Sequence, residues 1–312
     1  CSEIILRPYQ FCNLSEVVVR ESDTIEVLKT KVRLATILGT FQSTLTNFKY
    51  LRHVWKKNTE EERLLGVSLT GIMDSTLTAT PSDKLEVMLE MLRDTAVQTN
   101  ASFATKLKIP QSTAVTCVKP SGTVSQLTDA ASGIHARHNP YYIRTVRGDN
   151  KDPLTQFLIS EGIPAEPDVM KPDSTTVFSF PMKSPKGAVT RTAMTAIEQL
   201  ELWLTYQRHW CEHKPSVTIS VKENEWMDVG AWVYEHFDEV SGISFLPFSE
   251  HTYQQAPYQD IDEDQYKKFL TKMPKHVNWS KLQDFEKEDT TSGGRELACT
   301  AGVCEIVDIS AG

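Results

Sequence analysis

Sulfur accounts for most of the chemistry that this sequence could perform. The chain has six cysteines, too few and too scattered for the disulfide scaffold of a small secreted domain. One pair lies within twelve residues of the N-terminus and another within fourteen of the C-terminus, which favours thiol chemistry or metal binding over structural cross-links. The cysteines stand at positions 1, 12, 117, 211, 299 and 304.

A carboxylate accompanies the N-terminal pair. Cys1, Ser2 and Glu3 open the chain, and Cys12 follows after a segment that we expect to be extended or a loop. A thiol with a carboxylate two positions away has the groups for proton and hydrogen-atom chemistry on one substrate. The alternative is an incidental N-terminal cysteine, because the reactivity of a thiol depends on its environment.

The C-terminal pair follows a stretch of flexible composition, Thr290-Thr-Ser-Gly-Gly294. Cys299 and Cys304 are five residues apart with Gly302 between them, so they can close a small disulfide loop. On a mobile tail they could carry electrons to a buried site by thiol–disulfide exchange. A zinc site normally needs four ligands, and the tail has no further Cys or His, so redox use is favoured over metal binding.

A third candidate site is the loop Pro120-Ser-Gly-Thr-Val-Ser125, which follows an expected strand at 113–118. A strand, then small polar residues, then a helix can gather backbone N–H groups around a phosphate. The loop is not a Walker motif, because no Gly-Lys-Ser/Thr follows. An ordinary turn with a Ser or Thr helix cap is the alternative. The residues concerned are Ser121, Gly122, Thr123, Val124 and Ser125.

His209, Cys211 and His213 form an H-x-C-x-H cluster near the end of an expected helix. On a helix, residues 209 and 213 share a face but 211 points away, so we expect packing or solvent exposure and no metal. Three tryptophans nearby, Trp203, Trp210 and Trp226, are expected in the core.

Helical periods alternate with short β-rich runs, which predicts an α/β fold with a parallel or mixed sheet. Asp23 and Glu26 resemble a capping box, and Ser82-Asp83 opens a second helix. The helices are expected at 25–38, from 82 onward, at 192–213 and at 224–240, and the strands at 113–118, 176–180, 216–221 and 243–246.

Length and charge narrow the class of protein. The 312 residues suffice for one large core or two ordinary ones, and 41 acidic against 33 basic side chains give a net charge of −8. The acidic balance argues against nucleic acid as the main partner. No apolar stretch is long enough to span a membrane, and no signal peptide is present, so we expect a cytoplasmic protein.

The order of the motifs resembles the ribonucleotide reductases, in particular the adenosylcobalamin-dependent (class II) branch of the monomeric ribonucleoside-triphosphate reductase type. The resemblance covers nearly the whole chain, which corresponds to the C-terminal portion of a full-length reductase. It implies part of a ten-stranded α/β barrel with a central finger loop over residues 1–289, and a flexible redox-active tail over 290–312. It is carried by Cys1-Ser-Glu3, Cys12, Lys119-Pro-Ser-Gly-Thr-Val-Ser125, Ser132-Gly-Ile-His135 and Cys299-x4-Cys304.

The resemblance also implies roles for these residues. Cys1 matches the radical-bearing cysteine, Glu3 the carboxylate that assists proton removal at the ribose 3′ oxygen, and Cys12 one of the two cysteines that reduce the 2′ carbon. Residues 121–125 match the loop that holds the substrate phosphates. Cys299 and Cys304 match the tail pair that re-reduces the active-site disulfide and is reduced by a thioredoxin-like partner. The implied cofactor is adenosylcobalamin, and the implied substrate is a ribonucleotide.

The sequence departs from the family pattern at its start. The family has Asn-Pro-Cys-x-Glu, whereas this chain begins at the Cys, and the second reducing cysteine belongs to the absent N-terminal half. We therefore expect the chain to need that upstream half. The break before Cys1 suggests an interrupting intein, and truncation or removal of an initiator Met would look the same.

Two other interpretations remain open. A class I large-subunit fragment would need paired tyrosines near the C-terminus, but the one Tyr-Tyr pair, Tyr141-Tyr142, is far from it. A non-catalytic subunit that retained the fold would have no need of the cysteines and Glu3.

Overall fold

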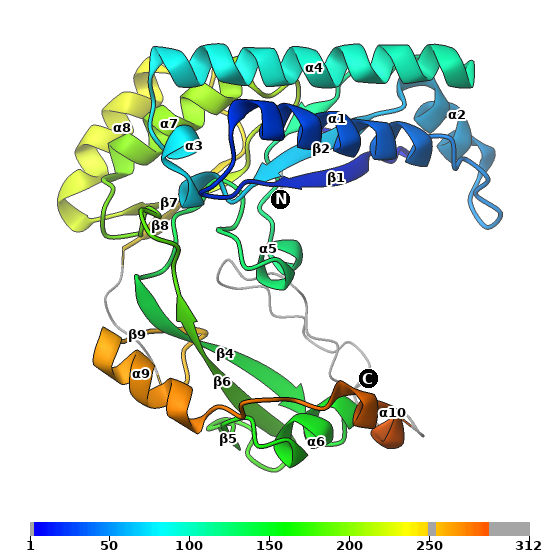
Figure 1. Ribbon diagram of the computed structural model, residues 1–312. Helices are drawn as coiled ribbons and strands as arrows, with labels where there is room; N and C mark the ends of the chain where they lie inside the picture. The colour runs from blue at the N-terminus through cyan, green and yellow to red at the C-terminus, as the bar shows by residue number, and fades with distance from the viewer. Residues whose placement is uncertain (1–2, 249–253, 287–312) are drawn as a thin grey trace, which may run out of the picture. The chain divides into compact units, whose positions relative to one another are not determined.

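The computed structural model describes residues 3–248 and 254–286, which divide into two compact units. The first unit comprises the chain up to Arg137 together with Pro185–Phe248, and the second comprises His138–Ser184 and the chain from Ser249 onward. Figure 1 shows the elements of both units.

Five parallel strands form the sheet of the first unit. Strands β1 (Asn13–Val18), β2 (Leu65–Thr70) and β3 (Thr116–Cys117) pair side by side in that order. Strands β7 (Val217–Val221) and β8 (Ile243–Pro247) also pair in parallel. A parallel bridge between Val118 and Pro215 joins the two groups, so the order is β1-β2-β3-β7-β8. The expected α/β class is thereby confirmed.

Helices connect these strands, as parallel pairing requires. The short α3 (Thr76–Ala79) and the 3₁₀ turn Ile72–Asp74 follow β2, and α5 (Thr123–Leu127) follows β3. A second 3₁₀ turn, Glu223–Glu225, leads into the last helix of the unit. The longer helices are α1 (Ile25–Gln42), α2 (His53–Glu62), α4 (Asp83–Leu107), α7 (Ala196–His209) and α8 (Trp226–Glu235).

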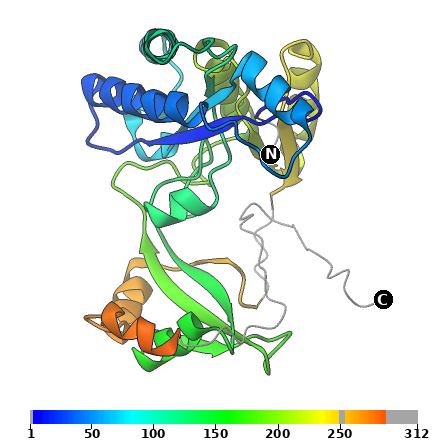
Figure 2. The same cartoon turned by 90° about the vertical axis from the view of Figure 1, so that its right-hand side faces the viewer.

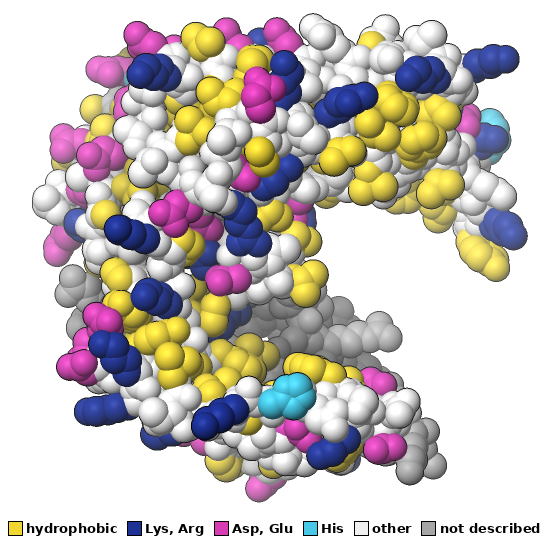
Figure 3. All heavy atoms as spheres, in the orientation of Figure 1, with side chains coloured by type: hydrophobic (Ala, Val, Ile, Leu, Met, Phe, Trp, Pro, Cys, Tyr) yellow, Lys and Arg dark blue, Asp and Glu magenta, His cyan; other side chains and the backbone are white. Residues whose placement is uncertain are grey.

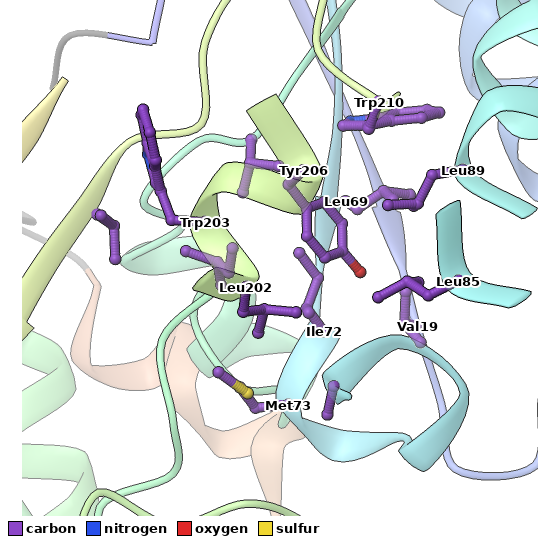
Figure 4. Close-up of a cluster of buried hydrophobic side chains, with 14 of the residues drawn as sticks. Val19, Leu69, Ile72, Met73, Leu85, Leu89, Leu202, Trp203, Tyr206 and Trp210 are labelled. Carbon is purple, nitrogen blue, oxygen red and sulfur yellow. The ribbon is translucent and has the colours of Figure 1, made fainter. Parts of the chain in front are cut away.

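The two faces of β1, β2 and β3 differ. On one face, Val17, Val67 and Leu69 are buried where α1 packs on the sheet and α4 packs on α1. Figure 4 shows Leu69 of this helix-covered face in a cluster with Leu85 and Leu89 of α4. The opposite face, which we call the polar face, carries Leu14, Glu16, Gly66, Ser68 and Cys117, because side chains alternate along a strand.

Three large aromatic side chains of α7 and its C-terminal end complete the core. Trp203, Tyr206 and Trp210 are fully buried, and each polar atom donates a hydrogen bond to a backbone carbonyl (Figure 4). Trp203 donates to Pro215 at 2.7 Å, Tyr206 to Thr78 at 3.0 Å and Trp210 to Cys117 at 2.8 Å. The expectation for Trp203 and Trp210 is confirmed, whereas that for Trp226 is wrong, since its side chain is 40% exposed at the first turn of α8.

The second unit is built on an antiparallel sheet of order β5-β6-β4-β9. Figure 2 shows the long strands β4 and β6 in green, and the helices α9 and α10 in orange. The strands are β4 (Tyr141–Asp149), β5 (Ala165–Pro167), β6 (Thr175–Lys183) and β9 (Tyr258–Asp260). The helices are α6 (Pro153–Ser160), α9 (Glu263–Lys272) and α10 (Leu282–Phe285), with a 3₁₀ turn at Trp279–Lys281.

Helix starts follow capping chemistry, which corrects two expected boundaries. Thr24, not Asp23, caps α1, while Asp23 binds the Arg20 amide and Lys31. Thr195 and Glu198 form a capping box that starts α7 at residue 196, not 192, and α7 ends at His209. Ser82 caps α4, as expected. The helix expected at 224–240 is shorter, and the strand expected at 113–118 contracts to Thr116–Cys117.

One surface feature stands out on α1. Figure 3 shows hydrophobic side chains, in yellow, gathered on the surface over this helix. Leu34, Leu38 and Phe41 are all exposed, and their spacing places them on one stripe of α1. No helix among the described residues is long and apolar enough to cross a membrane.

Candidate active site

The N-terminal segment places Glu3 and Cys12 at the start of β1. Glu3 is 6% exposed, and its carbonyl accepts a hydrogen bond from the Lys214 amide at 3.1 Å. The Oε2 atom of Glu3 is buried, and no described residue gives it a hydrogen bond. Cys1 lies outside the described residues, so its predicted place beside Glu3 stays a prediction.

Contacts with α2 fix the course of the chain between Glu3 and Cys12. The Arg7 guanidinium binds Glu61 at 3.0 Å, and the Gln10 amide donates to Glu62 at 2.5 Å. The Phe11 ring stacks on Trp55 with 4.7 Å between ring centroids. These contacts hold the segment against one helix, so the loop enters β1 in a defined direction.

The Cys12 thiol keeps its proton at neutral pH. Burial raises its pKa to about 12, and the nearby Glu3 carboxylate adds to that rise, while the Asn13 backbone amide acts in the opposite direction. A protonated thiol is a poor nucleophile but can still give up a hydrogen atom. The environment of Cys12 therefore suits hydrogen-atom donation better than attack by a thiolate.

Cys117 lies next to Cys12 on the polar face, a proximity that no motif in the sequence indicates. The sulfurs of Cys12 and Cys117 lie 3.5 and 3.3 Å from the point that a Cβ on Gly66 would occupy. A side chain at residue 66 would also meet Leu14 at 2.3 Å. Gly66 thus leaves the space that the two thiols occupy. Among the described residues Cys12, Cys117 and Cys211 are free thiols.

A row of polar side chains crosses the polar face beside these thiols. Glu16 is in register with Ser68, and Ser68 is in register with Cys117. The Ser68 hydroxyl accepts the Lys119 amide at 2.8 Å. Both Glu16 carboxylate oxygens are buried without a hydrogen bond from a described residue. Two carboxylates, Glu3 and Glu16, therefore stand near the thiols with unused acceptor capacity.

The H-x-C-x-H residues point to separate partners. His209 pairs through Nδ1 with Glu90 at 2.9 Å, while the Nε2 of His213 bonds the Leu65 carbonyl at 2.7 Å. Burial lowers the pKa of His213 and raises that of Cys211, so both are neutral at pH 7. No group of three or more His, Cys, Asp or Glu side chains within the described ranges is arranged to hold a metal ion.

The predicted phosphate loop, residues 121–125, follows β3 and runs into the first turn of α5. Gly122 caps α5, and the backbone N–H groups at the start of any helix have no partner within it. Ser121 and Ser125 are buried and hold the turn, since the Ser125 amide donates to Ser121 Oγ at 3.2 Å and its hydroxyl donates to the Ser121 carbonyl. Thr123 is exposed, and Val124 is half-buried. The serine side chains therefore shape the loop, and the Ser125 amide is used within it.

His135, in the motif that follows this loop, has a structural part. Its Nδ1 lies 2.9 Å from the Ser132 carbonyl, and its Nε2 accepts the Thr218 amide at 3.0 Å. Burial lowers the pKa of the imidazole, which stays neutral. Both ring nitrogens are used, so His135 ties this segment to β7.

The remaining predicted site residues, Cys299 and Cys304, lie outside the described residues. Among the described residues, the structure brings Glu3 and Cys12 together at the start of β1. Residues 121–125 follow β3, a strand of the same sheet. The structure adds Cys117, Gly66 and Glu16, which are far apart in sequence and meet through the register of three parallel strands.

Comparison with known structures first identifies the fold. The chain matches a crystal structure of a B-12 dependent (class II) ribonucleotide reductase with a TM-score of 0.78 at 23% identity. The match covers 93% of this chain and 44% of that one. Over the matched residues, the chain therefore has the fold of that part of the reductase.

Sequence comparison then gives names to the relatives. The chain is 30% identical over 285 residues to the adenosylcobalamin-dependent ribonucleoside-triphosphate reductase of Euglena gracilis, covering 90% of this chain. It is 28% identical to the enzyme of that name from Lactobacillus leichmannii, covering 98% of this chain. It spans 38% and 45% of the lengths of these two relatives. No family model matches the chain. The resemblance to the class II reductases is confirmed.

Proposed function

We propose that this chain is the catalytic C-terminal part of an adenosylcobalamin-dependent ribonucleoside-triphosphate reductase and works together with the upstream half of that enzyme. The observation that carries the proposal is the protonated Cys12 thiol beside Glu3, whose buried Oε2 receives no hydrogen bond from a described residue. These residues stand at the start of β1, in a chain that is similar to such reductases over nearly its whole length.

The residues divide the reaction between them. Cys1, as a thiyl radical, takes the 3′ hydrogen of the ribose and later returns it. Glu3 accepts the proton of the 3′ hydroxyl, for which its free Oε2 is available. Cys12 and a thiol of the upstream half supply two electrons and two protons. The 2′ hydroxyl leaves as water, and the two thiols end as a disulfide.

Adenosylcobalamin supplies, when bound, the organic radical that amino-acid side chains cannot generate. The described residues fit such chemistry, because burial keeps the Cys12 thiol protonated and removes the competing thiolate.

The substrate phosphates are proposed to lie on residues 121–125. The amides at the start of α5 would donate to phosphate oxygens, and the flanking Ser121 and Ser125 would hold the turn that aims them. No lysine or arginine lies within these five residues, so binding would depend on the direction of the backbone amides.

The tail and the partners complete the cycle. We propose that Cys299 and Cys304 reduce the disulfide of Cys12 by exchange and are reduced in turn by a thioredoxin-like protein of the cytoplasm. The five parallel strands of the first unit would form part of the ten-stranded barrel, which the upstream half completes, with Cys1 on the central finger loop. Mass spectrometry of the native protein tests whether splicing joins the two halves. A peptide that links upstream sequence to Cys1 would show that it does.

The decisive experiment is co-expression of this chain with the upstream half, followed by an assay with adenosylcobalamin, ribonucleoside triphosphate and a dithiol. We expect deoxyribonucleotide formation that is lost with Cys12→Ser and retained with Cys211→Ser, the matched control at another half-buried free thiol. Activity that needs an iron-bearing partner and no cobalamin would contradict the assignment, and absence of activity in the full assembly would support a non-catalytic subunit.

A further inference from the structure

Two guanidinium groups hold the C-terminal end of α5, the helix that follows the phosphate loop. Arg20 donates to the Asp129 carbonyl at 2.7 Å and also to the Thr128 carbonyl. Arg137 donates to the same Asp129 carbonyl at 3.0 Å and to the Asp129 carboxylate at 2.9 Å. Thr128 and Asp129 directly follow the last residue of α5, so these bonds fix the turn that ends the helix.

Arg137 is itself fixed by a buried carboxylate. Its Nε and Nη2 donate to the two oxygens of Asp74 at 2.7 and 2.9 Å. The Arg137 and Asp74 side chains are only 4% and 1% exposed. Asp74 also accepts the Ala131 amide at 2.8 Å. Since Asp74 ends the 3₁₀ turn after β2, the pair ties the segment behind α5 to the sheet.

The same segment is bonded to the front of the phosphate loop. The Ser132 hydroxyl donates to the Ser121 carbonyl at 2.6 Å, and the Thr70 hydroxyl bonds the neighbouring Ala131 carbonyl at 3.1 Å. A shift of residues 129–132 would therefore move Ser121 and turn the amides that follow it.

We propose that Asp74, Arg137 and Arg20 are positioning residues that aim the backbone amides of residues 121–125 at the substrate phosphates. The inference rests on the proposed function and deepens it. The loop has no cationic side chain of its own, so its affinity for phosphate depends on the direction of its amides. The two cations act from the far end of α5, through the backbone.

The test uses the reductase assembled with its upstream half. Arg137→Lys keeps the charge but loses the two-pronged pairing with Asp74. We expect KM for the ribonucleoside triphosphate to rise roughly tenfold, because charge-assisted hydrogen bonds that orient the loop are lost, while kcat changes less than about twofold. Arg20→Gln should raise KM by a smaller factor, and Arg20→Lys should restore part of it.

Arg208→Lys is the matched control. Arg208 also makes a two-pronged pair with a carboxylate, Glu239, at 2.7 and 2.6 Å, but that pair is exposed on the surface. It should leave KM unchanged. Unaltered KM in Arg137→Lys and Arg20→Gln, or a fall in kcat alone, would overturn the proposal. If Arg137→Lys fails to fold, the KM values of the Arg20 variants test the proposal. An inactive wild-type assembly would instead refute the proposed function.

Discussion

The two faces of β1, β2 and β3 are made by alternate residues of the same strands, yet they serve different ends. The helix-covered face is apolar and close-packed, with Val67 and Leu69 under α1 and α4. The polar face holds thiols, a glycine and the Glu16 carboxylate, whose buried oxygens receive no hydrogen bond from a described residue. The helix-covered face stabilises the fold. The polar face holds the reactive groups, and burying polar atoms there without hydrogen bonds costs free energy. This division predicts that substitutions on the two faces affect different measurements.

The largest effect is expected from Cys12→Ser on the polar face. A hydroxyl cannot form the disulfide that the proposed reduction requires, so activity of the assembled reductase should fall by roughly 10³-fold or more. The melting temperature should stay close to that of the wild type. Cys117→Ser, on the same face, is the control and should retain activity. Equal loss in both variants would show that the face carries two essential thiols.

The alkylation rate of Cys12 should also be strongly reduced. Because burial and Glu3 raise the Cys12 pKa to about 12 from 9.0, the thiolate fraction at pH 8 should be roughly a thousandfold lower than for an ordinary thiol. Iodoacetamide labelling followed by mass spectrometry measures this, with urea-unfolded chain as the reference. Glu3→Gln removes a negative charge and should speed the labelling of Cys12. Equal rates in the folded and unfolded chains would contradict a buried site.

On the helix-covered face, Leu69→Ala should lower the free energy of unfolding by about 2–5 kcal/mol, because Leu69 is buried and its loss leaves a cavity. Urea denaturation gives the value. Leu14→Ala on the polar face is the matched control. The Leu14 side chain is 37% exposed, so a cost near 1 kcal/mol is expected. A larger cost at Leu14 than at Leu69 would reverse the assignment of the faces.

The smallest expected effect is a dependence of stability on pH. Burial lowers the pKa of His135 and His213 from 6.5, so the unfolded chain binds more protons than the folded one in acid. The stabilisation they contribute is complete above about pH 6.5 and declines as the pH falls below it. Urea titrations at pH 5 and 7.5 measure the change. His213→Gln should flatten the dependence, whereas His53→Gln, at an exposed position, should leave it as steep as in the wild type.

Local signals in the sequence predicted part of this architecture. Ser82 before an apolar period located the start of α4, and the alternation of strands and helices predicted the parallel sheet. The predicted start of α1 was wrong because two neighbouring residues, Asp23 and Thr24, could each cap the helix. The predicted strand at 113–118 was too long because only part of this β-forming run pairs with a neighbouring strand.

Sequence patterns indicated less about the candidate site than about the helices and strands. Motif order predicted roles for Glu3, Cys12 and residues 121–125, whose positions the structure describes. The neighbourhood of Cys12, Gly66 and Cys117 depends on strand register between segments some fifty residues apart, which periodicity does not encode. The pairing of Asp74 with Arg137 is likewise invisible, because a charged residue in a sequence gives no sign of being buried with a partner.

The order β1-β2-β3-β7-β8 has a further consequence for handling this polypeptide. Among the described residues, β1 bonds to β2 alone and β8 to β7 alone, so each outer strand presents a row of backbone donors and acceptors. Such edges are templates for strand addition between chains, and β1 has few charges to prevent it. Association of this chain at high concentration is therefore expected to begin at β1 or β8 and to be suppressed by a polypeptide that pairs with those edges.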